Sequence, residues 1–364
     1  MMNFINRQNK HVVMAISAVI LLVLPLLLQQ GGNAWVRIAD TALLYVLLAL
    51  GLNIVVGYAG LLDLGFVAFY AIGAYMFGLL ASPHLTETFP WIAAMFPQGL
   101  HMPLWIVIPA GAALAGIFGI LLGAPTLKLR GDYLAIVTLG FGEIIRVFMN
   151  NLDHPVNITN GPKGLNQIDA IHFFNVNLGK PTNWFGLEVS SVTLYYYLFL
   201  ALVVISVVIC HRLELSRIGR AWMAIREDEI AAKAMGINTR NMKLLAFGMG
   251  ATFGGVSGSM FAAFQQFISP ESFSLMESVM IVAMVVLGGI GYLPGVILGA
   301  VLLSALPEVL RYVAGPLQAM TDGRLDSAIL RQLLIALAMI IVMLMRPRGL
   351  WPAPEHGKSL QPKS

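Results

Sequence analysis

Long apolar stretches recur along this chain, and they restrict its fold more than any other feature. Each runs for about 15 to 20 residues, and roughly 20 residues of helix are needed to cross a hydrocarbon layer of about 30 Å. We therefore predict a bundle of about ten transmembrane helices. The stretches lie at residues 12–28, 38–56, 64–80, 104–122, 133–149, 192–210, 244–265, 275–289, 295–310 and 328–345.

The composition supports an all-α, polytopic membrane fold. Hydrophobic residues make up 58% of the chain and charged residues only 11%, whereas soluble domains carry roughly 25% charged residues. A chain this apolar has too few polar residues to cover a surface that faces water. The stretches also lack the alternation of apolar and polar residues that a transmembrane barrel requires.

Lysine and arginine in the short connections predict the orientation. Cationic side chains are retained on the cytoplasmic side of the membrane during insertion. A cytoplasmic N-terminus followed by ten helices places most of the 22 basic residues inside. We therefore expect both termini in the cytoplasm, a lipid bilayer around the chain, and no nucleic-acid partner despite the pI of 9.2.

The connections leave room for one membrane domain, residues 1–350, and a cytoplasmic tail, residues 351–364. The external connection at residues 150–191 contains several prolines, glycines and asparagines, which favour turns over regular elements. The internal connection at residues 211–243 is the only sizeable one on its side. Both are too short for a folded catalytic domain, so we expect a chain that is not an enzyme.

Small residues recur at every fourth position in two of the stretches. Such stripes let helix backbones approach closely where lipid supplies no hydrophobic driving force. Tight packing inside one subunit is the first interpretation, and a subunit interface or a moving contact is the second. The two stripes are Gly111, Ala115, Gly119 and Gly123, and Gly250, Gly254, Gly258 and Ala262.

Glycine and proline interrupt the apolar pattern at residues 57–65 and 288–295. Breaks of this kind can place irregular backbone along a transport path, because backbone polar groups at membrane depth must face protein or water. Ordinary tight turns between adjacent helices explain them equally well. The residues predicted to border a translocation pathway are Gly57, Gly60, Asp63, Gly65, Gly288, Gly289 and Gly291.

Glu143 and Arg146 form the clearest candidate for an ion pair within a span. Residues three apart face each other on a helix, and pairing reduces the cost of burying their charges. A static bridge between helices is the first interpretation, and a gate or proton relay is the second. The seven histidines show no metal-binding spacing, so no metal site is expected.

Residues 227–235 predict a short cytoplasmic helix between two spans. Three acidic residues suit a helix N-terminus, the alanines favour helix, and Gly236 can adopt a left-handed C-cap. A small helix lined with alanine can bind in a groove on another protein. A solvated helix beside the membrane would have the same pattern.

This segment resembles the coupling motif E-A-A-x-x-x-G with which permeases of ABC importers dock their ATPase subunits. The matching residues are Glu229, Ala231, Ala232 and Gly236. The run from Gly219 to Ile237 is similar to that of M-type permeases of the LIV branched-chain amino acid importers, and further similar runs lie at residues 57–65, 139–144, 269–273 and 285–289. One departure is Ile230, which separates the glutamate from the alanine pair.

The resemblance implies a permease subunit in the bacterial inner membrane that carries leucine, isoleucine and valine. It also implies a homologous second permease, two cytoplasmic ATP-binding subunits and an external solute-binding protein. The chain contains no G-x-x-x-x-G-K-[ST] phosphate loop, so ATP is expected on the partners and no cofactor on this chain. Transport of urea or short amides, or ion-coupled secondary transport, are the alternatives.

Overall fold

The computed structural model describes residues 18–97, 100–126, 129, 131–173, 176–184, 187–320, 333, 336–337, 340–341, 344–345 and 349–351. Its named elements are α2 (Asn33–Leu52), η1 (Asn53–Tyr58), α3 (Val67–Leu80), α4 (His84–Thr88), α5 (Pro90–Met95), α6 (Leu104–Thr126), α7 (Asp132–Asn151), η2 (Gly161–Lys163), β1 (His172–Phe173), β2 (Val176–Asn177), β3 (Thr182–Trp184), β4 (Leu187–Val189), α8 (Ser191–Leu215), α9 (Arg217–Glu227), α10 (Glu229–Ala234), α11 (Thr239–Gln265), η3 (Pro270–Phe273), α12 (Leu275–Gly288) and α13 (Leu293–Met320).

The helices confirm a polytopic, all-α bundle. Within the described residues, seven helices are long and apolar enough to cross a membrane, and Ala18–Gln30 and Val67–Leu80 are shorter apolar helices. Together they correspond to the first nine predicted stretches, although the start of the first stretch lies outside the described residues. The tenth, residues 328–345, falls mostly outside them. The total of ten helices and the cytoplasmic termini therefore stay predictions.

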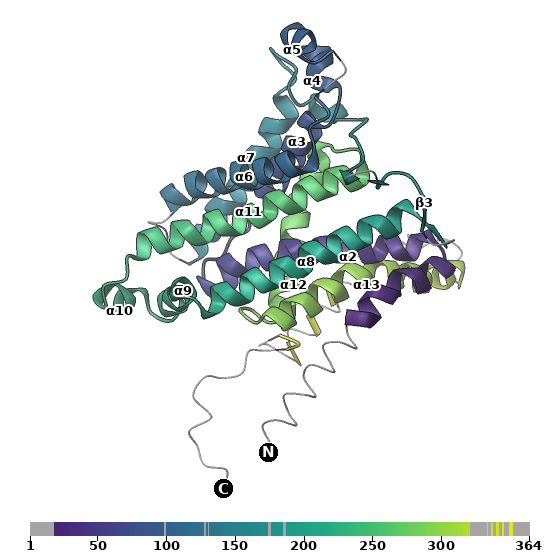
Figure 1. The fold of residues 1–364 in the computed structure, drawn as a ribbon. Helices are drawn as coiled ribbons and strands as arrows, with labels where there is room; N and C mark the ends of the chain where they lie inside the picture. The colour runs from purple at the N-terminus through teal and green to yellow at the C-terminus, as the bar shows by residue number, and fades with distance from the viewer. Residues whose placement is uncertain are drawn as a thin grey trace, which may run out of the picture.

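The bundle has two distinct ends (Figure 1). Helices α9 and α10 lie at one end, and strand β3 lies at the other. Helix α8 runs between them, and its 25 residues span about 37 Å at a rise of 1.5 Å per residue. The two sizeable polar connections therefore lie at opposite ends of the bundle.

The connection at residues 150–191 is more regular than the sequence suggested. It contains the 3-10 turn η2 and two antiparallel hairpins, β1–β2 and β3–β4. The connection is also tied to the bundle, because Leu165 pairs with Ile268 and the Asp169 amide donates to the Ala81 carbonyl. Turn residues indicated a loop but not the two hairpins, because strands of two or three residues are too short to show an alternating pattern.

Helix α11 is the central helix of the bundle, and it packs against α2, α3 and α6. A Cβ on Gly258 would lie 2.0 Å from the Tyr70 carbonyl oxygen of α3. A Cβ on Gly119 of the neighbouring α6 would lie 2.5 Å from the Ala251 Cβ of α11. The predicted small-residue stripes thus serve close packing within this chain.

A methyl group at residue 258 tests this packing. We expect Gly258→Ala to destabilise the isolated chain by about 3 kcal/mol or more, because rigid backbone on α3 occupies the added volume. Thermal unfolding in detergent measures the change. Gly140→Ala on α7 is the control, since nothing lies within 4 Å of the added Cβ, and its effect should stay within about 1 kcal/mol. Equal stability of the two variants would contradict the close packing of α11 against α3 at Gly258.

Candidate functional site

The predicted short helix is present, and it is preceded by a second helix that the sequence did not indicate. Helix α10 begins at Glu229 instead of Glu227, because Asp228 is extended and its side chain accepts hydrogen bonds from the amides of Ile230 and Ala231. The chain leaves α10 through Gly236, whose φ is +84°. The predicted left-handed C-cap at Gly236 is confirmed.

Helix α10 presents a small apolar tip to its surroundings. The exposed fractions of Ile230 and Met235 are 70% and 84%. Ala231 is also exposed, whereas Ala232 is buried against the rest of the chain. The alanine pair is therefore divided between an inner face and an outer face, and the outer face is available for a partner.

Glu229 is held by a residue of its own chain. Its Oε1 lies 2.7 Å from Nζ of Lys243, near the start of α11. The Lys243 side chain is only 7% exposed, against 33% for Glu229. A buried ammonium needs a nearby anion, so Glu229 fixes α10 to α11. The separation of Glu229 from the alanine pair by Ile230 agrees with this internal contact.

Removal of the Glu229 charge should be costly. We expect Glu229→Gln to lower the free energy of unfolding by about 1–3 kcal/mol, because it leaves the Lys243 ammonium without its anion. Thermal unfolding in detergent provides the measurement, with Lys233→Gln on the exposed side of α10 as the control. Adding Lys243→Met to Glu229→Gln should restore part of the loss. A Glu229→Gln protein as stable as the control would exclude this role.

The first long span ends in a break of its helix. Its last turn widens into the π-helix η1, and the Ala59 amide donates to the Ile54 carbonyl five residues earlier. The backbone then runs irregularly through residues 59–66 before α3 begins. Most of these residues are buried, so their backbone polar groups need partners inside the protein.

Three segments that are far apart in the sequence meet at η1. The Gly57 carbonyl accepts a hydrogen bond from Nη1 of Arg226 on α9. Oδ1 of Asn53 accepts a bond of 3.0 Å from the Gly291 amide in the turn between α12 and α13. A Cβ on Gly57 would lie 2.9 Å from that amide nitrogen. The structure therefore brings together Gly57 and Gly291, one residue from each predicted break.

Side chains from α7 and α12 hold the next part of the break. The Leu64 amide donates to the Thr138 hydroxyl at 3.0 Å, and the Ser278 hydroxyl donates to the Leu64 carbonyl. The Gly65 amide donates to Oδ1 of Asp63 at 2.8 Å. The irregular segment is therefore packed protein at these positions.

The remaining pathway candidates have different surroundings. Gly60 is exposed and lines a groove of about 270 Å³ together with Leu129, Arg226 and Glu229. Gly288 is the last residue of α12 and Gly289 begins the tight turn to α13, and a Cβ on Gly288 would lie 2.3 Å from the Gly295 carbonyl oxygen. That geometry fits a turn between closely packed helices. A role of these glycines in translocation stays a prediction.

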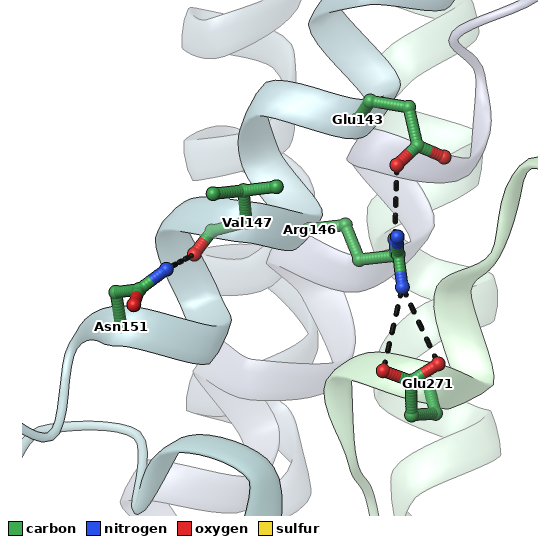
Figure 2. A network of polar contacts seen from close by, with 5 residues as sticks. All are labelled: Glu143, Arg146, Val147, Asn151 and Glu271. Atoms are coloured by element: carbon green, nitrogen blue, oxygen red, sulfur yellow. Dashed lines mark hydrogen bonds and ion pairs between the residues drawn. The ribbon is translucent and has the colours of Figure 1, made fainter.

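The predicted pair on α7 is part of a larger cluster (Figure 2). Nε of Arg146 lies 3.0 Å from Glu143, and Nη1 lies 3.3 Å from both carboxylate oxygens of Glu271 in η3. The side chains of Arg146 and Glu143 are 30% and 34% exposed. Arg146 therefore bridges α7 to η3, and this cluster lies apart from the break at η1.

Sequence reasoning missed four residues that organise these sites. Arg226, Lys243, Thr138 and Ser278 contact residues at least 14 positions away. Only Arg226 and Lys243 carried a signal in the sequence, since both are basic residues in the internal connection at residues 211–243, which contains the coupling motif. Glu271 was noted only as part of a similar run.

The bridging role of Arg146 predicts unequal effects within the cluster. We expect Arg146→Gln to lower stability by about 1–2 kcal/mol, because it breaks both contacts, and Glu271→Gln to cost under about 0.5 kcal/mol, because Glu271 is 71% exposed. Thermal unfolding in lipid nanodiscs compares the two.

Glu143→Gln should retain solute uptake if the pair is a static bridge. Normal stability with lost uptake would instead identify a gate or proton relay.

The fold defines a multi-pass membrane protein with a protruding helical segment at one end of its bundle. The chain belongs to the family described as "Branched-chain amino acid transport system / permease component", which matches residues 34–343.

Several relatives resemble most of the chain. The permease protein LivM of the high-affinity branched-chain amino acid transport system of Escherichia coli K12 is 40% identical over 341 residues, which cover 90% of this chain and 72% of the relative. The LivH permease of the same system is 26% identical over 338 residues, covering 91% of this chain and 97% of the relative. A probable LivM of Methanocaldococcus jannaschii is 24% identical over 336 residues, covering 85% and 90%. No solved structure matches the chain.

Proposed function

We propose that this chain is the M-type permease of an ABC importer that moves leucine, isoleucine and valine across a bacterial inner membrane. The names of its relatives support this substrate class. ATP would be bound and hydrolysed by two cytoplasmic partner subunits, and the chain itself would bind no cofactor. The exposed tip of α10 is the observation that carries the proposal, because its apolar residues protrude from the end of the bundle.

The end that bears α9 and α10 would face the cytoplasm. Its segment at residues 211–243 is rich in arginine and lysine, which favours the cytoplasmic side. The tip formed by Ile230, Ala231 and Met235 would then bind a groove on an ATPase subunit. The opposite end, with its two hairpins, would receive an external solute-binding protein.

A second, homologous permease subunit would cover the charged face of α7. Arg146 and Glu143 are partly exposed within a predicted span, and ionisable groups at membrane depth are expensive to expose to lipid. The similarity of the chain to both LivM and LivH permeases supports a pair of related subunits. The path for the solute would lie between the two.

Reconstitution tests the assignment. The chain is purified with its candidate permease and ATPase partners and its binding protein, and uptake of labelled leucine into proteoliposomes is measured with and without ATP. We expect uptake that requires ATP and is at least tenfold greater for leucine than for urea or acetamide. A preference for urea or acetamide would identify those solutes as the substrates instead. Uptake driven by a proton or sodium gradient without ATPase subunits would overturn the proposal.

Two charges placed on the α10 tip test the docking step. We expect Ile230→Asp combined with Met235→Asp to reduce co-purification of the ATPase subunits at least tenfold, since both side chains are exposed and apolar. Val156→Asp is the control, because Val156 is also apolar and 46% exposed but lies in the connection at residues 150–191. Deletion of residues 227–235 should abolish the association. ATPase subunits retained by the deletion variant would place docking elsewhere.

A further inference from the structure

The Arg226 side chain lies so close to Gly60 and Gly291 that a side chain at either position would collide with it. A Cβ on Gly60 would lie 2.8 Å from Cγ of Arg226, and a Cβ on Gly291 would lie 2.6 Å from its Nη1. Gly60 and Gly291 also have φ values of +69° and +83°, which residues other than glycine rarely adopt. The two turns are therefore built to admit this one arginine side chain, which reaches the Gly57 carbonyl between them.

Helix α9 is anchored to the bundle next to Arg226, which is itself exposed. Trp222, one turn earlier, is fully buried, and its Nε1 donates to the Met242 carbonyl of α11 at 2.7 Å. Ile225 is 5% exposed. A guanidinium is a planar group with several hydrogen-bond donors. It can therefore donate to the Gly57 carbonyl, which the broken helix leaves without a helical partner. Helix α9 is thus attached to α11 by Trp222 and to η1 by Arg226.

The same helix leads directly into the α10 tip, with only Asp228 between them. A displacement of α10 therefore reaches η1 through α9 and Arg226. Asn53 extends the connection, because it belongs to η1 and accepts a hydrogen bond from Gly291. The turn between α12 and α13 is thereby joined to the same contact.

We propose that Arg226 is a positioning residue that makes the α9–α10 segment, the η1 break and the α12–α13 turn move as one unit when the ATPase subunits close. Each of these three parts contacts Arg226 or a residue bonded to it. This role rests on the proposed function, because it assigns a task to the coupling segment of an ATP-driven importer. Arg226 acts through the backbone of the spans and touches no solute.

Variants of Arg226 in the full complex provide the first test. We expect Arg226→Ala to retain the ATPase subunits and ATP hydrolysis within about twofold, but to lower leucine uptake per ATP hydrolysed at least tenfold. Arg226→Lys should fall between Arg226→Ala and the unaltered complex, since one amine can still reach the Gly57 carbonyl. Arg217→Ala, an exposed arginine on the same helix, is the control and should change little. If leucine uptake per ATP hydrolysed by the Arg226→Ala complex is within twofold of that of the unaltered complex, the proposal is overturned.

A second test leaves Arg226 in place, so it stays informative if the variants fail to assemble. Spin labels are attached at Leu62→Cys and at Arg217→Cys on α9, both exposed positions outside the docking tip, after the single buried cysteine, Cys210, is replaced by alanine. We expect the distance between the labels to stay constant between nucleotide-free and ATP-trapped complexes. A change of several ångströms would show that the segment and the break move separately. Absence of ATP-driven uptake by the unaltered complex would instead reject the proposed function.

Discussion

Backbone groups in the break between α2 and α3 lie largely away from water, where no regular helix supplies their hydrogen bonds. In a membrane-spanning bundle such groups must be satisfied by other parts of the protein. Here the partners come from different helices, because Thr138 lies on α7, Ser278 on α12 and Arg226 on α9. The irregular segment is therefore a junction that fixes the relative positions of several helices.

The close packing of α11 makes this junction possible. Small residues of α11 bring α3 and α6 within backbone contact, as is usual where lipid does not drive helices together. The N-terminal end of α11 carries Lys243 and the Met242 carbonyl, which hold α10 and α9. The segment that we assign to ATPase docking is thus anchored on the most tightly packed helix of the bundle.

Apolar length and glycine spacing were sufficient to predict the bundle, the small-residue packing and the Gly236 cap, because each depends on local sequence or on a simple repeat. The Glu143–Arg146 pair followed from its spacing on one helix in the same way. The contacts of Arg226, Glu229 and Glu271 did not, since each joins segments that approach only in the folded chain. The start of α10 was placed at Glu227 because three acidic residues in a row all suit a helix N-terminus, and only the extended backbone of Asp228 identifies the cap.

The most direct measurement of the junction is amide hydrogen exchange over residues 59–66 in the assembled, nucleotide-free complex. The Leu64 and Gly65 amides donate to side chains inside the protein, so their exchange should be as slow as that of central α11 amides. The amides of His154 and Val156, exposed residues outside any helix or strand in the connection at residues 150–191, provide a fast-exchanging reference. Exchange of Leu64 and Gly65 at the rate of that reference would contradict a break held by side chains from α7, α9 and α12.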